Sequence, residues 1–289
     1  MRSYNLFTRF FVAVVFTTIT SLALAGFSAK QAYDADPEIL AKIEKKYDIQ
    51  IRMTGMGVSI SDDNMRATVQ DRWELSVPTK RLVIKSFGGD ISMKSTSDNK
   101  ITVIATGTLN KDKSPRLLEI NETSEETTLA EPENAVKNLE IRMEIPASFA
   151  KDLEIMSVSG DVSLENLKLN LAELKTVSGE ITVNKIDLPN LKIETVSGDT
   201  KVHDSKIKSV KGKSVSGEIE IENKDSADTS VNSISGDVKL KIPTTTQYEF
   251  KLNSISGDIK NHHKSSGDRK NTAKLNVEVN TTSGNIEIE

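Results

Sequence analysis

The chain has 289 residues, of which 36% are hydrophobic and only 4% are aromatic, so it favours a thin core of stacked aliphatic side chains over one thick globular core. It contains no cysteine, which excludes disulfide bonds, thiolate metal sites and a lipid-modified N-terminal cysteine. Charged residues make up 28% of the chain, both signs are interspersed and the formal net charge is -4, so no basic field predicts nucleic-acid binding.

The first 25 residues have the pattern of a secretory signal peptide. Arg2 and Arg9 flank the start of a short apolar stretch, and an A-x-A cleavage site at residues 23–25 precedes Gly26. Threonine and serine dilute the apolar stretch, which is short for a membrane span, so an uncleaved anchor is the alternative. We expect an exported protein of a bacterium, periplasmic or extracellular at the cell surface, with no integral membrane span after signal cleavage.

Residues 26–74 are expected to form an N-terminal cap. Asp36 and Pro37 resemble the start of a short helix, as N-cap and first helical residue, and apolar residues as far as Tyr47 share one face. We interpret this helix as a cover for the open end of the repeat, with docking of a partner as the alternative. Short alternating runs then predict strands outside the strict repeat, and Trp73 is expected to be a buried plug.

The repeat domain is predicted to cover residues 75–289. A degenerate copy of the repeated phrase, Ser-Phe-Gly-Gly-Asp-Ile, follows an aliphatic residue and Pro78, and the same lead-in recurs at Pro146 and Pro243. An acidic stretch at about residues 121–138 is interpreted as a solvated excursion loop that leaves the stack, with a cation or partner site as the alternative. Its acidic residues are Glu122, Glu125, Glu126, Glu131 and Glu133.

From residue 157 the chain repeats one phrase, first as Ser-Val-Ser-Gly-Asp-Val and then as Thr-Val-Ser-Gly-Glu-Ile. By subtraction, its glycines are 19, 19, 19, 19, 21 and 27 residues apart, and a short period is typical of stacked coils. Aliphatic and polar residues alternate within each unit, which is the period of a half-buried strand. We therefore predict an all-β fold: a parallel β-solenoid with coils of about 19 residues, a short N-terminal capping helix and a less regular N-terminal β region.

The repeated glycine is interpreted as a structural turn residue. It either adopts a positive φ at a corner or lets the chain bend where a side chain would collide with the next coil. The seven glycines are Gly160, Gly179, Gly198, Gly217, Gly236, Gly257 and Gly284.

A column of acidic residues follows these glycines. At β-strand spacing, neighbouring carboxylates would repel by about 1 kcal/mol even in water. We expect each carboxylate to accept local backbone N–H bonds, with Lys201, Lys239 and Lys260 supplying positive charge nearby. The alternative is a weak candidate metal site, in which Ca²⁺ bridges carboxylates of adjacent coils. Its candidate ligands are Asp161, Glu180, Asp199, Glu218, Asp237 and Asp258.

The three histidines do not form a catalytic constellation. His203 and Asp204 could act as a base and its orienting group, but no nucleophile is tied to them by spacing, so an exposed loop pair is the better interpretation. His262 and His263 lie in a polar insertion and are a weak signal for a metal. We predict no catalytic residue and no cofactor.

The recurring Ser-Gly-Asp-Ile/Val unit, the aliphatic-proline lead-in and the secretion signal together resemble the putative-adhesin β-strand-repeat family, bacterial exported domains of unknown function. The resemblance covers about residues 75–289 and implies a β-solenoid exposed outside the cytoplasm.

We expect a non-enzymatic, adhesin-like or cell-envelope scaffold protein that presents polar faces of the solenoid to an envelope protein or a surface glycan. Two alternatives remain open. One is a polysaccharide-acting β-helix enzyme, in which carboxylates such as Asp199 and Glu218 do acid-base work. The other is a calcium-stabilised structural module.

Overall fold

A computed structural model describes residues 50–54, 57–61, 67–110, 114–264 and 274–289. All regular structure within these residues is β, which confirms the predicted all-β class there. Strands β1 (Gln50–Thr54) and β2 (Gly57–Ser61) form an antiparallel pair, and the other twenty strands form one connected, solenoid-like assembly. The predicted signal peptide at residues 1–25 and the capping helix expected to end near Tyr47 lie outside the described residues.

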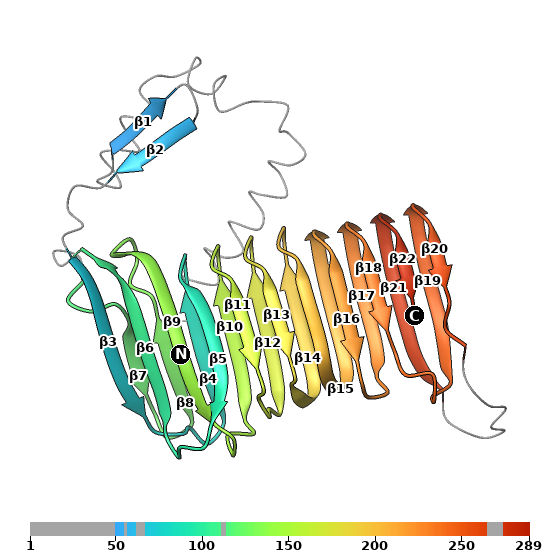
Figure 1. The fold of residues 1–289 in the computed structure, drawn as a ribbon, viewed down its shortest axis with the longest axis horizontal. Coiled ribbons are helices and arrows are strands. Elements are labelled where there is room, and N and C mark those ends of the chain that lie inside the picture. Colours follow the sequence, from blue (N-terminus) through green and yellow to red (C-terminus); the bar gives the residue numbers. More distant parts are fainter. Residues whose placement is uncertain (1–49, 55–56, 62–66, 111–113, 265–273) are drawn as a thin grey trace.

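The twenty strands stack side by side along the long axis of the molecule (Figure 1). A typical rung contributes one strand to a first sheet, turns at a corner and continues in a second sheet. The first sheet contains, in stacking order, β7 (Glu119–Glu122), β8 (Glu126–Ala130), β4 (Arg81–Ser86), β10 (Asp152–Ser157), β12 (Leu171–Thr176), β14 (Asp187–Thr195), β15 (Thr200–Ser216), β17 (Asp228–Ser235), β21 (Leu275–Ser283) and β19 (Tyr248–Ser256).

The second sheet packs face to face with the first and follows the same axis. It contains, in stacking order, β3 (Ala67–Leu75), β6 (Ile101–Leu109), β9 (Val136–Pro146), β5 (Asp90–Thr96), β11 (Val162–Glu165), β13 (Ile181–Asn184), the beginning of β15, β16 (Ile219–Asn223), β18 (Val238–Lys241), β22 (Ile286–Ile288) and β20 (Ile259–Asn261). Strand β15 runs through both sheets.

Neighbouring rungs of the repeat pair in parallel and are offset by one period of the sequence. Leu153 lies beside Ala172, Ala172 beside Leu191, and Leu191 beside Val210, each 19 residues further along the chain. These four side chains are at most 2% exposed and form one row of the interior. Because each rung adds only a few such aliphatic residues, the core is long and thin, and burial of each side chain depends on the rungs above and below.

The order of the rungs departs from the order of the chain at both ends. Near the N-terminus, β4 lies between β8 and β10. Near the C-terminus, β21 lies between β17 and β19, so the last segment of the chain inserts inside the stack. The 21-residue interval therefore joins Gly236 and Gly257, whose rungs are not neighbours in the stack, whereas the 27-residue interval joins the neighbouring rungs of Gly257 and Gly284.

The acidic segment predicted to leave the stack instead contributes a strand to it. Strand β8 pairs in parallel with β4, and its inward side chains Thr127 and Leu129 are buried. The acidic residues lie at its ends and outward positions, where Glu126 forms an ion pair with Arg81. The acidic composition concealed a short alternating strand pattern. Trp73, expected to be fully enclosed, is only partly buried against the core from β3.

Candidate functional site

The corners of the rungs form one continuous column of glycines. A Cβ added to Gly160, Gly179 or Gly198 would lie 2.0 Å from the carbonyl oxygen of the glycine in the neighbouring rung. Since that neighbour is backbone, no change of rotamer can relieve the overlap. At Gly217 the backbone also has a φ of 133°, which other residues rarely adopt. In stacking order the column is Gly89, Gly160, Gly179, Gly198, Gly217, Gly236, Gly284 and Gly257.

The acidic column lies beside the glycines, and its aspartates bind the backbone of the next rung. Oδ1 of Asp161 accepts the N–H of Glu180 at 2.8 Å, and Oδ1 of Asp199 accepts the N–H of Glu218 at 2.9 Å. The short side chain places the carboxylate against the neighbouring peptide group, so these aspartates act as structural acceptors. The same contact links Asp90 to Asp161 at 3.0 Å, Asp237 to Asn285 at 2.7 Å and Asn285 to Asp258 at 2.9 Å.

Lysines balance the longer carboxylates of the second sheet. Glu180 binds Nζ of Lys201 at 3.0 Å, and this hydrogen bond raises the pKa of the Lys201 amine. Lys239 lies 3.3 Å from Glu289, which raises the pKa of its amine in the same way. Within the described residues, no group of three or more histidine, aspartate or glutamate side chains is arranged to hold a metal ion.

A network of ion pairs covers the outer face of the first sheet. Glu173 binds both Lys175 and Lys192 at 2.7 Å, and Lys192 also lies 3.4 Å from Glu194 on its own strand. Burial alone would raise the pKa of Glu173, but the hydrogen bonds from the two lysines outweigh it and lower that pKa. Lys175 also lies 4.0 Å from Glu154 of β10, so the network fixes charged side chains in an array that crosses three rungs.

Further along the stack, the same face carries a ladder of asparagines. Nδ2 of Asn280 donates to Oδ1 of Asn232 at 3.1 Å, and Nδ2 of Asn253 donates to Oδ1 of Asn280 at 2.8 Å. The outer face of the first sheet thus carries a network of ion pairs in the middle of the molecule and a ladder of amide hydrogen bonds toward the C-terminal end.

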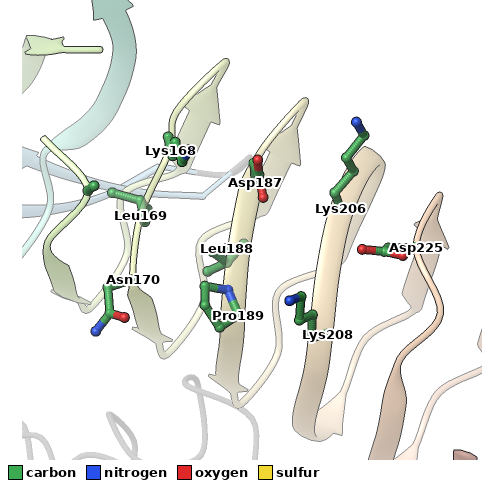
Figure 2. Close-up of a pocket in the computed structure, with 10 residues that line it drawn as sticks. Lys168, Leu169, Asn170, Asp187, Leu188, Pro189, Lys206, Lys208 and Asp225 are labelled. Atoms are coloured by element: carbon green, nitrogen blue, oxygen red, sulfur yellow. The ribbon is translucent and has the colours of Figure 1, made fainter. Parts of the chain in front are cut away.

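Strand β15 carries the densest group of exposed lysines, which we call the lysine rung: Lys206, Lys208, Lys211 and Lys213. Lys213 lies 3.7 Å from Glu194, and the other three form no ion pair with any described residue. Lys206 and Lys208 line a shallow cavity of about 260 Å³. Figure 2 shows that the side chains around this cavity come from successive rungs, with Lys168, Asp187 and Asp225 at its edges. Sequence reasoning missed this group, although lysine recurs at every second or third position from 206 to 213.

Glu131 has a different position from the one expected of an acidic loop residue. It is only 8% exposed and its Oε2 accepts the Ser86 hydroxyl at 2.7 Å and the N–H of Phe87 and of Gly88 at 2.7 and 3.1 Å. Glu131 thereby accepts hydrogen bonds from the first glycine corner. The neighbouring rung of β8 has no glycine corner that could supply carbonyl acceptors instead. The signal in the sequence is its place directly after β8, where other rungs carry serine or threonine.

The histidines do not form a catalytic site. His203 lies 3.8 Å from Glu222, whereas Asp204 binds Lys224 at 2.7 Å, a contact that lowers the pKa of Asp204. His263 packs its ring against Tyr248, with ring centroids 5.3 Å apart, and His262 is exposed. The two residues of the predicted base-orienter pair therefore have separate partners.

The protein is thus an all-β stack of rungs. Its corners meet through glycine, and its outer face carries ladders of polar side chains. The chain belongs to the Toastrack family DUF4097, whose model matches residues 79–289. This match confirms the resemblance to the putative-adhesin β-strand-repeat family. No curated protein matches the sequence.

Several solved structures align with most of this chain at low sequence identity. A putative adhesin from Bacteroides fragilis has 12% identity and a TM-score of 0.46 over 78% of this chain and 98% of its own. A putative lipid binding protein from Parabacteroides distasonis has 16% identity and a TM-score of 0.47 over 76% and 96%. A putative cell adhesion protein from Clostridium sporogenes has 12% identity and a TM-score of 0.37 over 77% and 99%.

Among the residues that the structure describes, no helix is both long enough and apolar enough to cross a membrane.

Proposed function

We propose that this chain is an exported, non-enzymatic, adhesin-like interaction protein, built as a parallel β-solenoid, that uses the lysine rung to contact a negatively charged component of the cell envelope. The observation that carries the proposal is the unequal pairing of charge on one continuous face. The lysines and glutamates from β10 to β14 neutralise one another, whereas Lys206, Lys208 and Lys211 are exposed and form no ion pair with any described residue.

A rigid support for these lysines favours binding. Strand β15 is paired on both sides over most of its length, with β14 and β17 in the first sheet, so its backbone is fixed before a partner arrives. Pre-ordered charges lose less entropy on binding than charges on a loop. The attraction should be strongest at low salt, because exposed charges are screened over about 10 Å at 0.1 M salt.

The polysaccharide-cleaving alternative has less support. Asp199 already accepts the N–H of Glu218 at 2.9 Å, so its carboxylate has a structural partner. Incubation of the purified protein with envelope polysaccharides should release no shorter glycans. Release of fragments that stops with Asp199→Asn and Glu218→Gln would establish the enzyme alternative instead.

The test of the proposed function measures binding of the labelled, purified protein to isolated bacterial envelopes. We expect binding that falls at least tenfold with rising salt and falls similarly in the double variant Lys208→Glu, Lys211→Glu. The matched control is Lys94→Glu, Lys100→Glu, two exposed lysines near the N-terminal end of the stack whose surface ion pairs contribute little stability.

Protease treatment or periodate oxidation of the envelopes identifies the partner as protein or glycan. Equal binding by the lysine-rung variant and the control variant would overturn the role of the lysine rung. Absence of envelope binding by the unmodified protein would overturn the proposed function itself.

A further inference from the structure

The two ends of the stack are built differently. At the N-terminal end, β3 pairs with β6 and β6 with β9 in antiparallel fashion, and β7 closes the first sheet against β8 in the same way. At the C-terminal end, the last rung consists of β19 and β20, which pair in parallel with β21 and β22. No described strand covers the outer edge of either. An uncovered strand edge presents unpaired backbone donors and acceptors, which favour pairing with another chain.

Exposed apolar side chains gather at the same end. Among the described residues, the large hydrophobic side chains that are exposed are Ile234, Ile255 and Ile259, at 51%, 83% and 44%. Two of the three belong to the last rung, and Phe250 and Leu252 of β19 are only partly buried. Exposed apolar groups concentrated in one place are typical of an interaction surface. Among the described residues, nothing therefore covers the backbone edge of the last rung or its exposed apolar side chains.

The geometry points to a second copy of this chain as the partner: we propose that two molecules join tail to tail, with β19 of each pairing antiparallel across a two-fold axis at Phe250. The carbonyl of Gln247 accepts from Leu275 on the inner side of β19. Because peptide groups alternate in direction along a strand, those of Tyr248, Phe250 and Leu252 point to the open edge. In the proposed register, Phe250 faces its own copy, and Tyr248 faces Leu252 of the other molecule.

The charges on β19 favour this register. Glu249 and Lys251 are both exposed on the outer face and flank Phe250. With the two-fold axis at Phe250, Glu249 of each molecule lies opposite Lys251 of the other, and this pair forms twice. Both pairs occupy the non-hydrogen-bonded positions of an antiparallel ladder, where side chains approach closest. A shift of the axis by two residues, to Leu252, would place Glu249 opposite Ile255 and Lys251 opposite Asn253, without any ion pair.

The charge pattern allows a test that does not disturb the fold. We expect the purified protein to be a concentration-dependent dimer in sedimentation equilibrium. Lys251→Glu places like charges opposite one another twice and should weaken the dimer at least tenfold. The charge swap Glu249→Lys with Lys251→Glu restores both pairs and should restore the dimer. Lys100→Glu, the same change at an exposed site near the N-terminal end of the stack, should leave the dimer unchanged.

A cross-linking measurement tests the register separately. The chain has no cysteine, so Glu249→Cys with Lys251→Cys introduces the only thiols. Facing positions in an antiparallel pair are within the distance that a disulfide spans. The double variant should form covalent dimers on mild oxidation, whereas Lys251→Cys alone should not. A protein that stays monomeric at every concentration, or a dimer indifferent to Lys251→Glu, would overturn the proposal. Neither result bears on envelope binding by the lysine rung.

Discussion

The two halves of the glycine column share one motif but build different corners. In the N-terminal half, the glycine N–H donates to a hydroxyl of its own rung: Gly179 to Thr176 at 3.0 Å, for example. In the C-terminal half, the glycine N–H donates to a carbonyl of the neighbouring rung, as from Gly236 to Ser283 at 3.1 Å. The hydroxyl of Ser233, which corresponds to that of Thr176, is then buried without a hydrogen-bond partner among the described residues.

The residue after the hydroxyl follows this difference. In the N-terminal half the strand ends at Thr176, and the next residue, Val177, is only 5% exposed. In the C-terminal half the strand continues through Ile234 to Ser235, and Ile234 is 51% exposed. Because the strand continues through this corner, the aliphatic side chain lies on the surface and not in the interior. The comparison shows that the motif fixes the position of a corner, whereas the partner of the glycine N–H fixes its shape.

The largest expected effect concerns the glycines. In Gly179→Ala the new Cβ would meet backbone at 2.0 Å, so we expect a loss of about 3 kcal/mol or more in the free energy of unfolding. Gly217→Val should be similarly damaging, because valine rarely adopts the backbone φ of 133° that Gly217 has. Gly212→Ala is the matched control, because its Cβ would lie 3.4 Å from Val231, and it should gain up to about 1 kcal/mol. Urea unfolding measures all three, and equal stability of Gly179→Ala and Gly212→Ala would contradict the stacking argument.

A smaller effect separates the two kinds of corner directly. Thr176→Val keeps the shape of the side chain but leaves the buried Gly179 N–H without its acceptor, which should cost about 1–3 kcal/mol. Ser233→Ala removes a buried hydroxyl that has no partner among the described residues, so stability should be unchanged or slightly higher. The two variants are compared in urea unfolding under one condition. Equal losses would show that both corners use the hydroxyl in the same way.

The sequence was sufficient to predict the all-β class and the position of the corners, because an alternating pattern with a short period can only bury its aliphatic residues by stacking. The shapes of the corners could not be predicted, since Thr176 and Ser233 occur in the same local phrase and differ only in what the neighbouring rung offers. The position of β21 between β17 and β19 depends likewise on contacts between distant segments.

The candidate site was harder to predict than the fold. Glu131 was placed in a solvated loop on composition alone, although it closes the first corner. The lysine rung was missed for a different reason. Its importance depends on which lysines have a carboxylate within ion-pair distance: Lys192 has two, Glu173 and Glu194, whereas Lys208 forms no ion pair with any described residue.

A third prediction tests whether the acidic column requires charge. Asn285 naturally occupies one position of the column and accepts the N–H of Asp258 at 2.9 Å, as the aspartates do for their neighbours. Asp199→Asn keeps the acceptor, so its free energy of unfolding should stay within about 0.5 kcal/mol of the unmodified protein. Asp199→Ala removes the acceptor and should lose about 1 kcal/mol. Denaturant unfolding at neutral pH distinguishes them, and a large loss in Asp199→Asn would show that the carboxylate charge itself is needed.

The smallest expected effect is a pH dependence confined to the C-terminal end. Burial lowers the pKa of His263 below its ordinary value of 6.5, and the nearby backbone of Thr246 offsets this only in part. A histidine with a lowered pKa in the folded state binds protons more readily when unfolded. Its contribution to stability is therefore complete above pH 6.5 and declines as the pH falls toward the lowered pKa.

The measurement is the melting temperature of the protein at several values between pH 8 and pH 5, compared with that of His263→Phe. The phenyl ring keeps the packing against Tyr248 and Phe250 but does not titrate, so the variant should lose less stability on acidification than the unmodified protein. His203→Phe is the control, because it removes a histidine from the beginning of β15, several rungs away from the last rung. His203 has a different neighbour, Glu222, at 3.8 Å. Identical pH profiles for the unmodified protein and His263→Phe would show that the last rung tolerates a charged imidazole, and that its aromatic cluster is open to water.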